Sequence, residues 1–146
     1  MQNKSVKFAI ILDILFMAAL LALLFLAPGI VGWYCGIRHL SVTIHNAILM
    51  CFYACSIPAA TALALLLKLL FNMNKNFIFE RQNSNILSGV SYCSILVSAI
   101  TAVGAVFYMP FLFIAFAFLF LFFIIRLVVG CFKAATLLKQ ENELTI

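Results

Sequence analysis

Four long apolar stretches, separated by short polar breaks, organise this chain of 146 residues. Each stretch has about the 20 residues that a helix, rising about 1.5 Å per residue, needs to cross a hydrocarbon layer about 30 Å thick. The pattern predicts an all-α integral membrane protein, a single domain whose four transmembrane helices form two antiparallel hairpins. The predicted spans are residues 7–27, 44–67, 86–108 and 111–132.

The polar breaks predict where these spans end. Pro28 and Gly29 are expected to end the first span, because proline cannot continue the helical hydrogen-bond ladder and glycine tolerates a turn. Residues 108–110 favour a short turn between antiparallel helices. Residues 72–85 predict an aqueous loop, and residues 133–146 predict a tail that continues as a helical extension.

The distribution of basic residues predicts the orientation of the chain. One side of the predicted membrane is flanked by Lys4, Lys7, Lys68, Lys75, Arg81, Lys133 and Lys139. Arg38 flanks the other side. Since cytoplasmic segments carry an excess of lysine and arginine, both termini and the loop at 72–85 are expected in the cytoplasm.

The composition supports a membrane protein and argues against several other classes. Hydrophobic residues make up 67% of the chain and charged residues 9%, whereas a soluble domain carries about a quarter charged residues. The lipid bilayer is therefore the expected solvent. The net charge of +5 comes from cations at the ends of apolar runs, so it indicates topology and not direct nucleic-acid binding.

Chemistry-bearing residues are few, and their spacing supports no enzyme, metal site or cofactor. The five cysteines form no Cys-x-x-Cys pair, and His39 and His45 lack the i, i+4 spacing that metals favour on a helix. The phenylalanines of residues 111–123 point in all directions around the expected helix, so no single cofactor face is predicted. No nucleophile–base pair or phosphate-binding loop is found, and we expect a protein without catalytic residues.

Asp13 and Arg126 are the charges placed inside predicted spans. Asp13 lies about 9 Å beyond Lys7, and Arg126 lies about 10 Å before Lys133, so both occupy one layer of the inner leaflet. Charges at such depth usually have a partner or a function. We expect an intramembrane ion pair between them; the alternative is that Asp13 carries protons in a small transporter.

The third predicted span carries small residues at steps of mostly three and four. They are Ser91, Ser94, Ser98, Thr101, Ala102 and Ala105. Such a face lets helices approach closely and form hydrogen bonds across the contact, so we interpret it as a helix-packing face. Lining a polar pathway is the alternative interpretation, and the face is also compatible with a homodimer.

Three segments together resemble a known family of bacterial membrane proteins. Residues 76–83 and Leu87 resemble its Phe-x-x-x-Asn-x-x-x-Leu pattern, with Phe79 and Asn83 at the matching places. The other two segments are the turn at residues 107–111 and the pair of stretches 125–128 and 141–146. In this order the motifs resemble, over nearly the full length, the family catalogued as domain of unknown function 2975.

The resemblance implies a four-span protein of the bacterial plasma membrane without an assigned reaction, often encoded beside a small helix-turn-helix regulator of the Xre type. We therefore expect a regulatory or interaction protein that binds a cytoplasmic repressor. Phe77 and Phe79 support a contact surface, because they are apolar yet lie in an aqueous loop. The predicted contact residues are Phe77, Phe79, Asn83, Leu87, Glu141, Asn142 and Leu144. The alternatives are a proton-coupled transporter or channel-like protein using Asp13, and an immunity or stress protein that protects the membrane from a peptide toxin.

Overall fold

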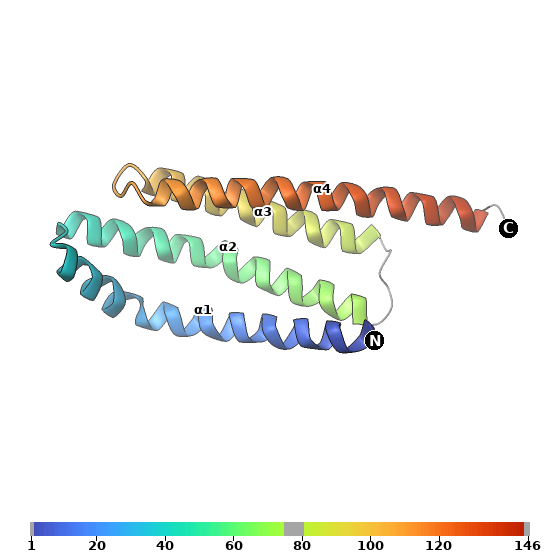
Figure 1. The fold of residues 1–146 in the computed structure, drawn as a ribbon, viewed down its shortest axis with the longest axis horizontal. Coiled ribbons are helices and arrows are strands. Elements are labelled where there is room, and N and C mark those ends of the chain that lie inside the picture. The colour runs from blue at the N-terminus through green and yellow to red at the C-terminus, as the bar shows by residue number, and fades with distance from the viewer. Residues whose placement is uncertain (1, 75–80, 145–146) are drawn as a thin grey trace.

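The computed structural model describes residues 2–74 and 81–144, and these residues form four α-helices (Figure 1). They are α1 (Gln2–Arg38), α2 (Val42–Asn74), α3 (Arg81–Gly104) and α4 (Phe111–Leu144). All four are long and apolar enough to cross a bilayer. The chain therefore has the architecture of a multi-pass, all-helical membrane protein, in which most backbone hydrogen bonds form within each helix.

The helices pack in chain order, α1 against α2, α2 against α3, and α3 against α4. Within the described residues, the backbone of α1 does not come close to the backbone of α3 or α4. The start of α1, the end of α2, the start of α3 and the end of α4 lie at one end of the molecule (Figure 1). At that end α4 extends well beyond the other three helices.

The first helix does not end at Pro28, contrary to the expectation from sequence. α1 runs for 37 residues through Pro28 to Arg38, and Figure 1 shows it changing direction in its C-terminal part. Pro28 has no N–H, so the carbonyl of Leu24 loses its helical donor. The Tyr53 hydroxyl of α2 donates to this carbonyl at 3.2 Å. Because a neighbouring helix supplies the missing donor, the helix bends and continues.

The connection between α1 and α2 is a three-residue turn, much shorter than the segment 28–43 that the sequence suggested. His39 adopts a left-handed conformation, with φ of 50°. The N–H of His39 bonds the Gly36 carbonyl at 3.4 Å, and the N–H of Leu40 bonds the Cys35 carbonyl at 3.0 Å. This is the Schellman pattern, which satisfies the last carbonyls of a helix and reverses the chain within a few residues.

α3 is the most deeply buried helix, and it is covered by α2 on one side and α4 on the other. Its small side chains allow this close packing. A Cβ atom added to Gly89 would lie 2.9 Å from Cδ1 of Leu65 on α2. The Ser98 hydroxyl donates to the Ala115 carbonyl of α4 at 2.8 Å, which joins the two helices directly.

The turn between α3 and α4 begins earlier than the sequence suggested, at Gly104. The Gly104 carbonyl accepts bonds at 3.0 Å from the N–H groups of Phe107 and Tyr108. A Cβ atom at Gly104 would meet the Phe111 ring at 2.9 Å and Cys51 Sγ at 3.1 Å. The absence of a side chain there lets the first ring of α4 close over the end of α3.

Candidate functional site

The structure does not form the predicted ion pair between Asp13 and Arg126. Asp13 lies on α1 and Arg126 on α4, the two outermost helices of the row, whose described backbones do not approach each other. The guanidinium carbon of Arg126 lies 6.0 Å from the centroid of the Tyr92 ring on α3, within the range of a cation–π contact. The sequence predicts a similar membrane depth for the two charges, but their helices are not neighbours in the structure.

Asp13 is 7% exposed, and its Oδ2 atom is buried without a hydrogen-bond partner. The contacts of Leu24 with Tyr53 and of Gly32 with His45 set the antiparallel register of α1 and α2. Continued at equal rise, this register places Asp13 opposite the stretch 62–67 of α2, which contains only alanine and leucine. The carboxyl group therefore faces an apolar partner helix.

The predicted packing face of α3 divides into a buried part and a part that is not buried. Ser91, Ser94, Ser98 and Thr101 are all buried. Ala102 is exposed and Ala105 is half-buried beyond the end of the helix, so neither belongs with the buried group. Gly104 takes their place, because it lies three residues after Thr101 and continues the same face.

Most of the buried hydroxyls bond their own helix instead of lining a polar path. Ser94 donates to the Val90 carbonyl at 3.2 Å, and Thr101 donates to the Val97 carbonyl at 2.8 Å. This back-bonding satisfies the hydroxyl without a neighbour or water. The face therefore packs as a small, internally satisfied surface.

Asn83, predicted as a contact for a partner protein, is fully buried. The Nδ2 atom of Asn72 at the end of α2 donates to Oδ1 of Asn83 at 3.0 Å. The amide pair thus ties the end of α2 to the start of α3, across the residues that connect them. Asn83 has a structural position and is not available at the surface.

The remaining predicted contact residues lie in different places. Leu87 is half-buried within α3, whereas Glu141, Asn142 and Leu144 are exposed on the last turn of α4. Phe77 and Phe79 lie outside the described residues.

At the end of the molecule away from the termini, α1 is joined to the α3–α4 turn by a pair of tyrosines that the sequence analysis did not single out. The hydroxyls of Tyr34 on α1 and Tyr108 in the α3–α4 turn form a short hydrogen bond. This bond raises the pKa of Tyr108 above its ordinary value of 10.0, and partial burial adds to the effect. The contact links the first helix to the last hairpin, although their backbones stay apart. Nothing in the sequence spacing of the two tyrosines, which are 74 residues apart, marks them as partners.

An apolar groove of about 320 Å³ lies in the half of the molecule away from the two termini and is lined by all four helices. Ala27 of α1, Phe52 of α2, Val97 of α3 and Phe118 of α4 are among its walls. Its lining is almost entirely apolar, so hydrocarbon can fill it without losing hydrogen bonds. The polar groups among its lining residues are the thiols of Cys51 and Cys55 and the hydroxyl of Thr101, which already donates within α3.

No cluster of three or more histidine, cysteine, aspartate or glutamate residues occurs among residues 2–74 and 81–144, and the five cysteines are free thiols. A comparison of the chain with family models, curated proteins and solved structures gives no match.

Proposed function

We propose that the chain is a non-enzymatic protein of the bacterial plasma membrane, with both termini in the cytoplasm, that binds a cytoplasmic helix-turn-helix repressor. The resemblance to the family catalogued as domain of unknown function 2975 supplies the class of partner. The excess of basic residues at the end holding both termini supports the orientation. One feature of the fold carries the proposal, namely the C-terminal part of α4.

This part of α4 leaves the helix row while still helical. The last residues of α4 extend past the start of α3 (Figure 1), where no described helix covers them. Leu138 is 61% exposed and Leu144 is 87% exposed, although both lie beyond Lys133, in the polar part of the helix. The two leucines lie about 120° apart around the helix, so they form two separate exposed apolar contacts, each of which a partner protein can cover.

The test compares leucines on the same helix that are all more than half exposed. The double variant Leu138→Ser and Leu144→Ser should reduce the amount of the repressor encoded beside the chain that co-purifies with the tagged membrane protein by at least tenfold. It should also change transcription of the repressor's target. The matched control is Leu127→Ser, because Leu127 is 73% exposed but lies within the apolar part of α4. If the double variant recovers as much repressor as the wild type and leaves transcription unchanged, the proposal is wrong.

Asp13 favours a second candidate function, a small proton-coupled transporter. Its buried carboxyl faces an apolar helix and has an unpartnered oxygen, and Arg126, the basic partner predicted for it, instead lies over the Tyr92 ring. A carboxyl in such surroundings costs less to bury when protonated, and it can pick up or release a proton when a neighbouring group moves. Proton-driven flux in proteoliposomes that disappears in Asp13→Asn would establish this candidate, and an equal flux in both proteins would remove it.

A further inference from the structure

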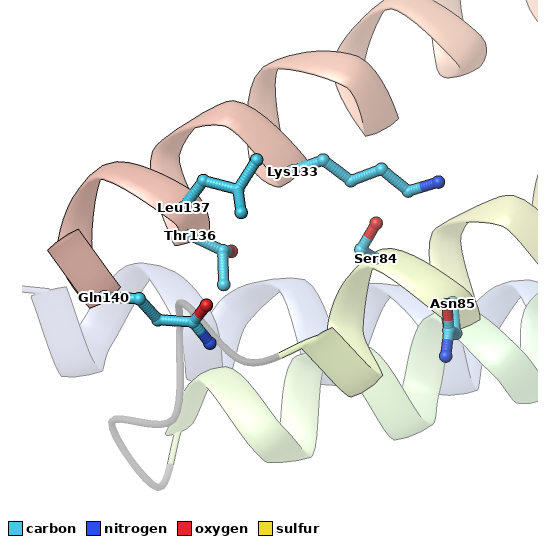
Figure 2. Close-up of a pocket in the computed structure, with 6 residues that line it drawn as sticks. All are labelled: Ser84, Asn85, Lys133, Thr136, Leu137 and Gln140. Atoms are coloured by element: carbon cyan, nitrogen blue, oxygen red, sulfur yellow. The ribbon is translucent and has the colours of Figure 1, made fainter.

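A pocket of about 310 Å³ lies between the start of α3 and the extended part of α4 (Figure 2). Its walls are Ser84 and Asn85 from α3 and Lys133, Thr136, Leu137 and Gln140 from α4. The lining residues of α3 and those of α4 are about 50 residues apart in the sequence, so the sequence alone does not indicate that they share a pocket. The pocket is distinct from Asp13, from the apolar groove lined by all four helices, and from the exposed side chains of Leu138 and Leu144.

The pocket combines several features that attract a negative charge. Lys133 supplies a cation, and the described lining contains no carboxylate. Ser84 and Asn85 lie in the first turns of α3, whose first turn carries no acidic side chain. The free N–H groups and the dipole of a helix N-terminus favour an anion at that place.

Ser84 gives independent support for a ligand. It is 2% exposed, and its Oγ atom is buried without a hydrogen-bond partner. Figure 2 shows this hydroxyl directed toward α4, with the Lys133 side chain extending above it. An unpaired buried hydroxyl is unfavourable, so an acceptor that reached it beside the lysine would gain a hydrogen bond. The flexible lysine stem is the part that must move to admit that acceptor.

The level of the pocket in the membrane indicates where the anion comes from. Arg126 is the one charged residue in the stretch 111–132 of α4, and Lys133 is the first residue after it. Lys133 therefore marks the boundary between hydrocarbon and water, at the depth of lipid headgroups. Basic pockets between membrane helices at this level recognise anionic headgroups.

We propose that this pocket binds the phosphate group of an anionic phospholipid in the leaflet facing the chain termini. The Lys133 ammonium neutralises the phosphate, the Ser84 hydroxyl donates to one of its oxygens, and the positive end of the α3 dipole favours its charge. Gln140 and Asn85 provide further amide donors at the rim. The proposal does not depend on the repressor, and it can hold whether or not the chain binds one.

The experiment is a lipid titration of the purified, detergent-solubilised full chain, followed by native mass spectrometry. Phosphatidylglycerol should bind the wild type more tightly than phosphatidylcholine, whose choline cation would lie against Lys133. Lys133→Gln should weaken phosphatidylglycerol binding about fivefold, the effect of roughly one basic residue near a lipid surface. The matched control is Lys68→Gln, which removes an exposed cation on α2, near the same end of the molecule but outside the pocket lining. This variant should bind phosphatidylglycerol with an affinity within twofold of that of the wild type.

Ser84→Ala separates ligand binding from a purely structural role. Because Oγ of Ser84 has no partner in the lipid-free protein, the variant should unfold at the same temperature as the wild type or higher in detergent alone. It should nevertheless gain less thermal stability from added phosphatidylglycerol. Equal lipid affinity in the wild type, Lys133→Gln and Ser84→Ala would overturn the proposal. Binding of inorganic phosphate in place of phosphatidylglycerol would overturn the lipid source.

Discussion

Replacing Tyr53 with phenylalanine removes the one hydroxyl that replaces the donor missing at Pro28. The Tyr53 ring is 40% exposed, but its surroundings at that depth are lipid, so no water takes over the Leu24 carbonyl. Interhelical hydrogen bonds in membranes contribute about 0.6 kcal/mol on average and up to about 1.7 kcal/mol. Leaving a carbonyl unpaired in an apolar medium costs about 1–3 kcal/mol. For a bond of 3.2 Å at the helix surface, we expect Tyr53→Phe to destabilise the protein by about 1 kcal/mol.

A double-mutant cycle identifies the cause of that loss. Pro28→Ala restores an N–H that can bond the Leu24 carbonyl within α1, so the Tyr53 hydroxyl becomes dispensable. In the Pro28→Ala protein, Tyr53→Phe should therefore cost close to zero, which gives a coupling energy of about 1 kcal/mol. The stability of Pro28→Ala alone is less informative, because straightening α1 also changes how its residues pack around the apolar groove.

The assay is reversible unfolding in mixed micelles, with increasing sodium dodecyl sulfate and helix content followed by circular dichroism. Tyr92→Phe is the control, because the Tyr92 ring contacts Arg126 through its face and phenylalanine keeps that face. If Tyr53→Phe costs the same in both backgrounds, within about 0.3–0.5 kcal/mol, the hydroxyl does not support the proline site and the explanation is wrong.

Three further measurements test the contacts that join the helices. Ser98→Ala should cost about 0.6 kcal/mol in the same unfolding assay because it removes a bond to α4, whereas Ser94→Ala, which removes a bond within α3, should cost less. Gly104→Ala should cost about 1–3 kcal/mol, because the new methyl group meets the Phe111 ring and Cys51. A raised pKa of Tyr108 in the folded state contributes stability below pH 10, and this contribution is lost as the pH rises through the folded pKa. Tyr34→Phe should move the phenolate absorbance of Tyr108 to lower pH, and an unchanged titration would argue against the bond.

The helices themselves could be predicted from sequence, because hydropathy over about 20 residues reports a property of each segment alone. Lys68 and Lys133 mark where the apolar stretches of α2 and α4 meet their first C-terminal lysines, but the helices continue to Asn74 and Leu144. The end of α1 could not be predicted in this way. Pro28 stops a helix only if the freed carbonyl has no other donor, and that donor is Tyr53, which lies on another helix.

The candidate sites depended on which helices are neighbours, and segment-by-segment reasoning does not contain that information. Asp13 and Arg126 had the right depth but lie on non-adjacent helices. Asn83 lies within the stretch 72–85 that the sequence predicts as a loop, yet in the structure it belongs to α3, is buried and pairs with Asn72. The pocket at Ser84 and Lys133 arises where the start of one helix meets the end of another, and neither residue is unusual within its own segment.

The open row of helices also explains why Asp13 is unusual for this fold. α3 has helices on both sides, and the buried hydroxyls of its packing face, Ser91, Ser94, Ser98 and Thr101, are satisfied within α3 or by α4. Among the described helices, the backbone of α1 comes close to α2 alone, and Asp13 lies opposite a stretch of alanine and leucine there, so its carboxyl group gains no partner from packing. Asparagine has nearly the same volume and no charge to desolvate, so the fold should be as stable or more stable with Asp13→Asn in the unfolding assay. A marked loss of stability would show that the carboxylate has a structural partner. Unchanged stability together with lost proton flux would show that its contribution is chemical.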